Sequence, residues 1–273
     1  MGELENKEQR LYEQLARVPA LIVAYSGGVD SAYLAYAAHR ALGDRMLAVT
    51  ALSASYSERD RREAEACVAR FKLPHEFIET DELSNPSYRA NNPDRCFFCK
   101  DELFDKLDEM AARRGFAAVA YGVNLDDQGD WRPGQRAARN HQVLAPLLDA
   151  GLTKADIREL ARRADVPVWN RPASACLSSR IAYGIEVTAE RLKIVEQGEE
   201  ALRQLGFRQM RVRYHEDLVR IEIAPEELPR ALNPEMARKF AEIFKTLGFK
   251  FVTLDLEGYR TGSLNTHLIQ IHN

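Results

Sequence analysis

The 273-residue sequence lacks the features of a membrane or exported protein. It has no stretch close to the roughly 20 consecutive apolar residues that a membrane helix needs. Its opening segment, MGELENKEQRLYEQLARV, is charged and amphipathic rather than typical of a signal sequence. These absences predict a cytoplasmic protein with no membrane partner.

A large excess of one charge is also missing. Lys and Arg number 38 against 41 Asp and Glu, so the formal net charge is -3. Such a chain has no overall basic field with which to hold a nucleic-acid backbone. We therefore expect no nucleic-acid partner and a small or locally recognised substrate. With 45% hydrophobic and 29% charged residues, the composition also excludes a disordered or collagen-like chain.

Cysteine is scarce. The four present are Cys67, Cys96, Cys99 and Cys176. In a reducing compartment, structural disulfides are not expected in a chain of this size. The thiols therefore indicate metal, redox or nucleophilic chemistry, or no chemistry at all.

Short apolar runs alternate with helical patterns through the first half of the chain. Strands are expected at 20–25, 46–52, 75–79 and 117–121, and helices at 32–42, 58–71, 103–114 and 153–164. Strands that alternate with helices of this length form crossover units around a parallel sheet that is covered on both faces. The first half is predicted to be an α/β doubly wound domain, and Thr153 and Asp156 to form a capping box at the start of its last helix.

The pattern changes after an irregular, proline-bounded connection that begins near residue 165. Beyond it, helices are expected around 189–205 and 234–247, and strands at 209–214, 218–223 and 251–256. We therefore predict two unequal domains, with residues 1–165 in the doubly wound domain and residues 166–273 in a smaller α+β domain.

The strongest motif is the loop Ser26-Gly27-Gly28-Val29-Asp30-Ser31, which follows a buried strand and precedes a helix. Glycines let the backbone turn sharply so that several amides point at one spot, where the helix N-terminus adds partial positive charge. A plain glycine turn with an Asp or Ser cap is the simpler interpretation. The phosphate-loop pattern GxxxxGK[ST] does not fit, because no lysine follows.

This loop resembles the SGGxDS loop of the N-type ATP pyrophosphatases, which split ATP between its α and β phosphates and adenylate a substrate. The resemblance implies that the loop binds ATP and that Asp30 is needed for catalysis. It also places Gly122, at the end of a predicted strand, in the ATP site. The ATP-contacting loop residues are Ser26, Gly27, Gly28, Asp30 and Ser31.

Cys96 and Cys99 are one helical turn apart at the start of a helix, where the helix dipole favours thiolate. A CxxC pair is compatible with a redox site, with half of a zinc site or with coincidence. The six histidines show no metal-ligand spacing that would complete a zinc site. Together with Cys176, the pair makes a plausible set for a [4Fe-4S] cluster with one open iron. Cys67, among small apolar neighbours in a helix, is expected in the core.

Two further motifs, NLDDQGDWRPG at 124–134 and PASACLSSR at 172–180, narrow the resemblance. With the loop, they make the whole chain similar to the ATP-dependent sulfur transferases that complete the pyridinium bisthiocarboxylate nucleotide of the nickel-pincer cofactor of lactate racemase. Such enzymes adenylate the carboxylates of pyridinium-3,5-biscarboxylic acid mononucleotide, release pyrophosphate and convert each carboxylate to a thiocarboxylate.

In that family, the cysteine that matches Cys176 bears the sulfur. Members with this cysteine alone give up its sulfur and become dehydroalanine, whereas members with two more cysteines resemble cluster enzymes that carry a transferable sulfide. Cys96 and Cys99 match the second pattern. The resemblance therefore implies a [4Fe-4S] cluster on the three cysteines, a sulfide donor as partner, and a homo-oligomer.

Charged residues complete the predicted site. Asp126, Asp127 and Asp130 follow a strand and would hold Mg²⁺ over the phosphates, although capping the next turn is an equal alternative for Asp127 and Asp130. Arg211 and Arg213 alternate along a strand, so both lie on one face, which is suited to a phosphate or to solvent. By resemblance, the ligands of the substrate nucleotide are Arg211, Arg213, Arg260, Glu200 and Glu222, with Glu199 lining the same pocket.

Two rival functions remain at this stage. Some tRNA thiolases also combine an SGGxDS loop with CxxC and a distant cysteine, but they need a basic surface for tRNA, which the net charge of -3 disfavours. The second rival function is that of a nucleotide-binding or Fe-S carrier protein without turnover. Release of pyrophosphate in the presence of the nucleotide substrate distinguishes the carrier from an enzyme.

Overall fold

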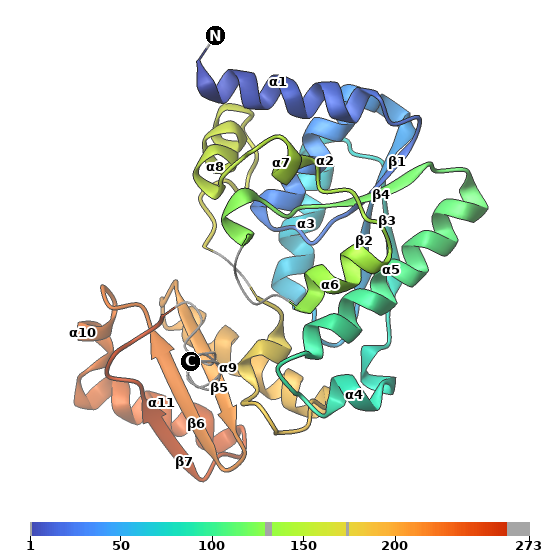
Figure 1. The fold of residues 1–273 in the computed structure, drawn as a ribbon. Coiled ribbons are helices and arrows are strands. Elements are labelled where there is room, and N and C mark those ends of the chain that lie inside the picture. The colour runs from blue at the N-terminus through green and yellow to red at the C-terminus, as the bar shows by residue number, and fades with distance from the viewer. Residues whose placement is uncertain (1, 129–132, 173–174, 261–273) are drawn as a thin grey trace, which may run out of the picture. The chain divides into compact units, whose positions relative to one another are not determined.

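The computed structural model describes residues 2–128, 133–172 and 175–260. The chain divides into two compact units (Figure 1). The first comprises Met1–Glu82 and Cys96–Ser174, and the second comprises Leu83–Arg95 and Ala175–Asn273. This division differs from a single break at residue 165 in two ways, because the later break follows Ser174 and the segment 83–95 lies with the second unit.

A parallel four-stranded sheet with the order β3-β2-β1-β4 is the centre of the first unit. Its strands are β1 (Leu21–Ala24), β2 (Met46–Leu52), β3 (His75–Glu79) and β4 (Ala118–Tyr121). The strands β1 and β4, which are separated by almost 100 residues of chain, are direct neighbours, and Ala24 pairs with Tyr121 at their carboxyl ends. The sequence-based prediction of an α/β fold with a parallel sheet is confirmed.

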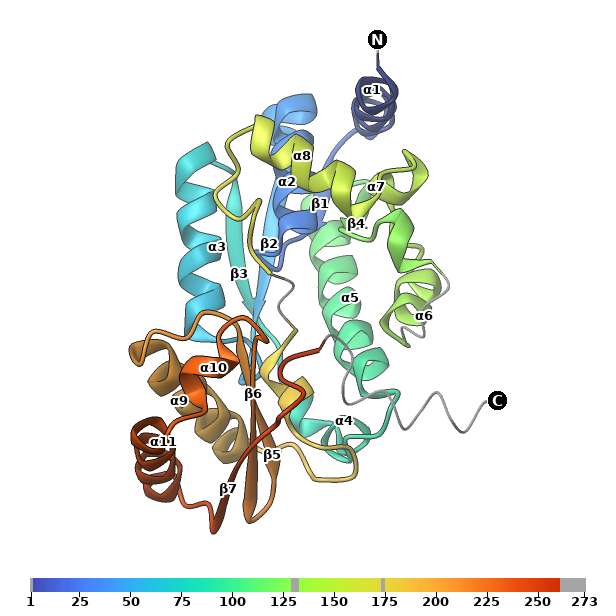
Figure 2. The same cartoon turned by 90° about the vertical axis from the view of Figure 1, so that its left-hand side faces the viewer.

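Helices cover both faces of this sheet, as Figure 2 shows around β1 and β2. On one face, Leu21 and Val23 pack with α1 (Glu3–Ala16), α2 (Val29–Leu42), α3 (Glu58–Phe71), α7 (Pro146–Asp149) and α8 (Lys154–Arg163). On the other, Ile22 and Ala24 pack with α5 (Arg95–Arg114) and α6 (Pro133–Asn140). Side chains alternate between the two faces along a strand, and both faces are covered here. Every residue of β1 is therefore buried, which explains why the whole strand is apolar.

The second unit contains a three-stranded sheet with the order β5-β6-β7. Strands β5 (Met210–His215) and β6 (Leu218–Ile223) are antiparallel, and β7 (Phe251–Leu254) runs parallel to β6. The helices of this unit are α4 (Pro86–Arg89), α9 (Ala189–Gln204), α10 (Leu228–Ala231) and α11 (Pro234–Thr246). This sheet with helices confirms the expected small α+β region.

The segment 83–95 joins the second unit through Asn91, which is fully buried. Its side-chain amide donates hydrogen bonds to the carbonyl oxygens of Ile181, Ala182 and Ile185 at 3.2, 2.8 and 2.9 Å. These bonds satisfy carbonyls that lie outside any helix or strand. One short segment thus holds together the loop that follows Cys176.

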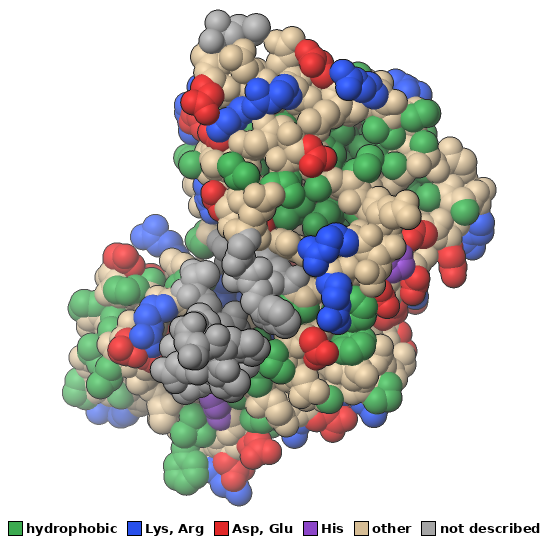
Figure 3. Space-filling model, viewed as in Figure 1, with side chains coloured by type: hydrophobic (Ala, Val, Ile, Leu, Met, Phe, Trp, Pro, Cys, Tyr) green, Lys and Arg blue, Asp and Glu red, His purple; other side chains and the backbone are tan. Residues whose placement is uncertain are grey.

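Most predicted elements agree with the structure to within one or two residues, including β2 and α3 over their full lengths. The helix predicted at 103–114 is the main exception, because α5 begins eight residues earlier, at Arg95. In the part of the chain that the structure describes, no helix is long and apolar enough to cross a membrane. Figure 3 shows acidic and basic side chains interspersed over the visible face.

Candidate functional site

The loop 26–31 connects the carboxyl end of β1 to α2. Gly27 has a φ of +76°, and a Cβ at this position would lie 2.9 Å from the Cβ of Ala64. The hydroxyl of Ser31 donates to the Gly28 carbonyl at 3.0 Å and accepts from the Ser26 amide at 3.2 Å. The loop is therefore held in a tight turn by its own serines and by packing that only glycine allows.

The N-terminus of α2 opens directly from this loop. Gly28 is the N-cap residue, and none of the described side chains caps the helix. The first amides of a helix have no intrahelical partner, so they and the helix dipole favour an anion at this point. The geometry agrees with the predicted anion cradle.

Gly122 lies against the same helix end. A Cβ at Gly122 would be 2.7 Å from the Ser31 nitrogen and 2.9 Å from the Asp30 carbonyl carbon. Any larger residue would push the end of β4 away from the loop. The structure thus brings Gly122 together with Asp30 and Ser31, and the binding of ATP by these residues stays a prediction.

Asp30 forms an ion pair with Lys154, the first residue of α8. Burial raises the pKa of the Asp30 carboxyl, although Lys154 acts in the opposite direction. The Oδ1 atom of Asp30 is buried and has no hydrogen-bond partner among the described residues. A buried carboxylate oxygen without a partner is costly, so this atom is a natural ligand for a cation.

Lys154 is a site residue that the sequence patterns did not identify. A signal was nevertheless present: a lysine in the first turn of a helix opposes the helix dipole, which is unfavourable unless an anion lies close by. The predicted capping box places it, since Thr153 Oγ1 accepts from the Asp156 amide at 3.1 Å and the Asp156 carboxylate accepts from the Thr153 amide at 3.0 Å.

The acidic residues after β4 have different roles. Asn124 caps the short helix η3 (Leu125–Asp127), and the Asp127 carboxylate accepts from the Asn124 amide at 3.1 Å, which completes a capping box. Asp127 is therefore a capping residue, the alternative left open by the sequence. Asp126 is exposed and accepts a hydrogen bond from the Lys154 amide at 2.8 Å. Asp130 lies outside the described residues.

The cysteines of the first unit fall into two kinds. Cys67 on α3 is fully buried, burial raises the pKa of its thiol, and the residue packs in the core as predicted. Cys96 and Cys99 are the second and fifth residues of α5, Cys96 exposed and Cys99 half-buried. Their position at a helix start agrees with the sequence argument for thiolate character. Whether they meet Cys176 at one site stays a prediction.

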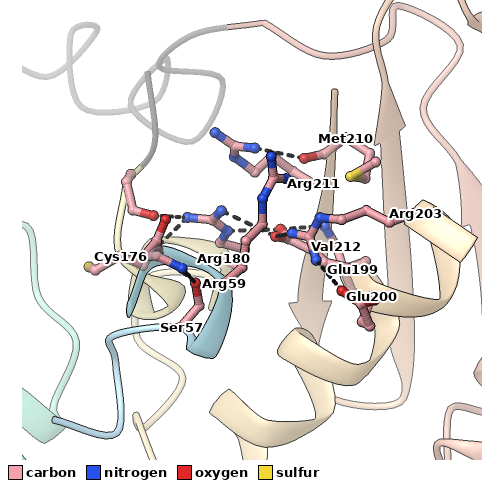
Figure 4. A network of polar contacts seen from close by, with 12 residues as sticks. Ser57, Arg59, Cys176, Arg180, Glu199, Glu200, Arg203, Met210, Arg211 and Val212 are labelled. Atoms are coloured by element: carbon pink, nitrogen blue, oxygen red, sulfur yellow. Dashed lines mark hydrogen bonds and ion pairs between the residues drawn. The ribbon is translucent and has the colours of Figure 1, made fainter. Parts of the chain in front are cut away.

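Cys176, in the second unit, is exposed and immediately precedes the short helix η4 (Leu177–Arg180). The guanidinium of Arg180 donates to the Cys176 carbonyl at 2.9 Å and to Glu199 Oε1 at 2.9 Å. Figure 4 shows these contacts, with the sulfur of Cys176 pointing away from the guanidinium. Arg180 and Glu199 thus fix the backbone that presents the thiol.

Glu199 and Arg180 form a buried ion pair. Burial alone would raise the pKa of Glu199, but Arg180 and its neighbours outweigh it and lower the pKa below its ordinary value. Glu199 also accepts from Arg203 at 3.3 Å. The predicted substrate residue Glu200 is instead exposed and pairs with Arg203 at 3.0 Å.

The antiparallel pair β5-β6 places a second charged group on one sheet face. Arg213 donates to Glu222 Oε2 at 2.8 Å and to the Ser179 carbonyl at 2.9 Å, and Arg220 donates to Glu222 Oε1 at 3.2 Å. Arg213 and Glu222 are both buried. Arg213 and Glu222 are thus brought together as a buried ion pair, and their binding to a substrate stays a prediction.

Arg211 lies on the same strand, with its guanidinium 4.9 Å from the centre of the Tyr259 ring. Burial and the neighbouring Arg180 lower the pKa of Arg211 to about 10. Burial is the larger cause, and Arg180 adds a repulsion between like charges that a bound anion would relieve. Arg260 is exposed and pairs with Glu257 at 2.7 Å. The arginine group therefore favours an anion beside Arg211.

Comparison with known proteins defines the class of the chain first. A model of the NAD synthase family matches residues 5–116, a range that includes the glycine loop and the first three strands. Together with the parallel sheet, this match identifies an ATP-using protein with an N-type ATP pyrophosphatase domain.

Relatives over the full length give the particular family. The chain is 33% identical over 271 residues to the pyridinium-3,5-bisthiocarboxylic acid mononucleotide synthase of Lactiplantibacillus plantarum, covering 98% of this chain and 97% of the synthase. It is 40% identical over 262 residues to the uncharacterised protein slr1717 of Synechocystis, covering 96% and 98%. A glutamine-hydrolysing GMP synthase component of Pyrococcus furiosus is 26% identical over 75% of this chain and 70% of its own length. The chain belongs to the family of the bisthiocarboxylic acid mononucleotide synthase.

Proposed function

We propose that this protein is an ATP-dependent sulfur transferase that converts the carboxylates of pyridinium-3,5-biscarboxylic acid mononucleotide to thiocarboxylates. A carboxylate oxygen attacks the α-phosphorus of ATP, and pyrophosphate leaves. Sulfur then attacks the acyl carbon, and AMP leaves with the carboxylate oxygen. The observation that carries this proposal is the uncapped, glycine-lined start of α2 in a chain related to such a synthase over its whole length.

The leaving pyrophosphate would bind at the start of α2. The proposed contacts are the loop amides, the hydroxyls of Ser26 and Ser31, and the Lys154 ammonium next to Asp30. Fixed donors that face the position where charge develops are the main source of stabilisation in phosphoryl and adenylyl transfer. Gly122 keeps this end of the sheet open to the nucleotide.

Magnesium fits the carboxylates at this site. Asp30 has a buried oxygen without a partner among the described residues, and Asp126 is exposed and follows the same sheet edge. Both would hold Mg²⁺, with Asp130 as the third predicted ligand. Bound Mg²⁺ would neutralise phosphate charge. Asp30 would in addition hold Lys154 in place.

Thiolates on one helical turn are a donor set that fits iron and sulfide. Cys96 and Cys99 at the start of α5, with Cys176, would hold a [4Fe-4S] cluster. When bound, the cluster would supply sulfide that an external donor renews. Arg180 would orient the Cys176 backbone through its carbonyl.

The phosphate of the substrate nucleotide would bind the arginine group on β5. Arg211 is the strongest candidate, because its guanidinium is largely buried beside Arg180, and a bound phosphate would offset both the burial and the repulsion that lower its pKa. Arg213 would contribute from its pair with Glu222, and Arg260 and Glu200 would line the outer part of the site.

The test is a single anaerobic reaction with ATP and the dicarboxylate nucleotide. We expect AMP and pyrophosphate in equal amounts and more than one sulfur transferred per chain. ADP and phosphate as products would rule out adenylation, and absence of turnover would favour a carrier protein.

The source of the sulfur is tested with cysteine variants of the same protein. Cys96→Ala and Cys99→Ala should lose iron, sulfide and multiple turnover together, whereas Cys67→Ala should retain all three. A yield that stops at one sulfur per chain, with a mass loss of about one H₂S on Cys176 only, would show a sacrificial thiol.

A further inference from the structure

A second group of metal-ligating side chains lies in the first unit, between α5 and the residue after α6. Asp101, Asp105 and Asp108 follow one another along one face of α5, at spacings of four and three residues. The ring of His141, which follows the last residue of α6, faces this stripe. None of these residues belongs to the ATP loop or to the cysteine motif.

The orientation of the imidazole is fixed from two sides. Its Nδ1 lies 2.7 Å from Asp108 Oδ2, so this nitrogen would carry the proton, and donate it to Asp108, when Nε2 binds a metal ion. The ring is 14% exposed and lies 5.9 Å from the ring of Phe104. Nε2 faces the other two carboxylates, and a metal ion could take the place of a proton between them.

The distances from Nε2 match those between ligands of one metal ion. Asp101 Oδ1 is 3.2 Å and Asp105 Oδ1 is 3.8 Å from His141 Nε2, and one ligand atom from each residue fits within 4.8 Å of the others. Two ligands at roughly 2.1 Å from a tetrahedral metal are about 3.4 Å apart. Small side-chain rotations would therefore complete the coordination.

The charge of this group is unbalanced. Three carboxylates face a single imidazole, and among the described residues no lysine or arginine forms an ion pair with any of them. Lys106 on the same helix is engaged elsewhere, because it pairs with Glu102 and donates to the Glu79 carbonyl. A bound cation would relieve the repulsion between the carboxylates.

We propose that His141, Asp101 and Asp105 bind one divalent first-row transition-metal ion, with Asp108 positioning the imidazole. A carboxylate that accepts the Nδ1 proton while Nε2 binds the metal is a common arrangement in metalloproteins. One nitrogen and two carboxylate oxygens suit Mn²⁺, Fe²⁺ or Zn²⁺, and water would fill the remaining positions.

The ion would join α6 to α5 near the cysteine motif. At the other end of α6, a Cβ at Gly134 would lie 3.0 Å from the Lys100 side chain and 3.5 Å from the Cys96 carbonyl oxygen, so the two helices already pack closely there. The metal would provide the second point of attachment. Its role is therefore structural support of the first turns of α5 rather than chemistry on the substrate.

Mn²⁺ is the probe, because thiolates compete for it much less than for Zn²⁺. The full-length protein is titrated with Mn²⁺ in the absence of ATP, and bound ion is counted by loss of the free Mn²⁺ electron paramagnetic resonance signal. Asp105→Asn should lose one bound ion or weaken its binding by about 10- to 100-fold, and Asp108→Asn by about 10-fold. Glu109→Gln, an exposed carboxylate on the same helix, should bind as the unmodified protein does.

Loss of folding does not explain the expected result. Asp105→Asn removes one of three like charges, so the metal-free variant should be at least as stable as the unmodified protein, and Mn²⁺ should raise the melting temperature of the latter only. Equal binding by Asp105→Asn and Glu109→Gln would overturn the proposal, as would a dissociation constant weaker than about 1 mM.

The protonation of the two nitrogens of the His141 ring tests metal binding at Nε2 directly, which a measurement of activity does not. In long-range ¹H–¹⁵N spectra, the signals of the His141 ring are identified as those that disappear in His141→Asn. With Zn²⁺ bound, this ring should keep its Nδ1 proton and show a metal-bound Nε2. A ring that stays unchanged at saturating Zn²⁺ would also refute the site.

Discussion

The two units present charge to a ligand in opposite ways. In the first, the loop before α2 offers backbone amides and a carboxylate with one unpartnered oxygen. In the second, the charges around β5 are buried side chains that already pair with one another, as Arg180 on η4 does with Glu199 on α9 and Arg213 on β5 with Glu222 on β6. The first arrangement suits a phosphate chain and a cation. In the second, the ion pairs fix the orientation of long arginine side chains, which suits the binding of one anion.

The pKa shifts express the same difference. Burial raises the pKa of Asp30 despite Lys154, so one lysine does not fully compensate the burial of this carboxylate. In the second unit, Arg180 lowers the pKa of Glu199 despite complete burial, and burial together with Arg180 lowers the pKa of Arg211 to about 10. A cation is therefore expected to bind at Asp30 and an anion at Arg211.

The largest expected effect comes from breaking a buried pair in the second unit. Glu222→Ala leaves the Arg213 guanidinium buried without its carboxylate, and such losses cost about 3 to 5 kcal/mol in the free energy of unfolding. Urea unfolding measures it. The control Glu200→Ala removes an exposed pair and should cost about 1 kcal/mol or less. Similar costs for the two variants would mean that burial does not distinguish these pairs.

The next effect is on catalysis in the first unit. Asp30→Asn removes the negative charge that holds Lys154 and the proposed ligand of Mg²⁺, and should lower kcat by on the order of 10²- to 10³-fold with little loss of stability. Pyrophosphate release measures it, with the exposed Asp44→Asn as control. Retention of more than about one tenth of the activity would remove Asp30 from the reaction.

A smaller effect is expected for the substrate arginines. Arg211→Ala should raise KM for the nucleotide about 10- to 100-fold and leave KM for ATP nearly unchanged, because one charged hydrogen bond to phosphate is lost. Arg213→Ala should act in the same direction, but it also strands Glu222, so Arg211 is the cleaner probe. The exposed Arg208→Ala is the control. An equal rise in both KM values would contradict the assignment.

Much of this architecture is readable from the sequence, because it depends on local patterns. Apolar runs predict β1 and β2, the capping box predicts the start of α8, and the apolar neighbours of Cys67 predict its burial. The alternation of Arg211 and Arg213 predicts a shared face. Each of these signals lies within a few residues of the position that it predicts.

Contacts between distant segments were not predictable. Asn91 bonds to carbonyls some 90 residues further on, and nothing near it in the sequence marks this role. Lys154 meets Asp30 across 124 positions. The spacing of the histidines does not reveal His141 as a ligand, because its partners are aspartates on α5, among them Asp108, 33 residues earlier. Such pairs depend on how helices pack, which a single sequence does not specify.

The smallest expected effect compares two histidines in opposite surroundings. Burial together with Arg220 and Arg213 lowers the pKa of His215 below 6.5, whereas Asp108 and Asp101 outweigh burial and raise the pKa of His141 above 6.5. His215 binds protons less readily in the folded protein than in the unfolded chain. The stability that the neutral His215 ring allows is therefore lost as the pH falls from 6.5 through the lowered pKa of His215. Folded His141 binds more protons than the unfolded chain, so its contribution is present below 6.5 and lost as the pH rises through its raised pKa.

The two histidines are separated by measuring free energies of unfolding across this range with a chelator present, so that a proton rather than a metal ion occupies His141. Relative to the unmodified protein, His141→Asn should be most destabilised at low pH and approach it as the pH rises. His215→Asn should do the reverse, gaining relative stability as the pH falls, because the folded variant no longer resists protonation beside Arg213 and Arg220. Parallel pH profiles for the two variants would mean that the acidic surroundings in the first unit and the basic surroundings in the second do not control these side chains.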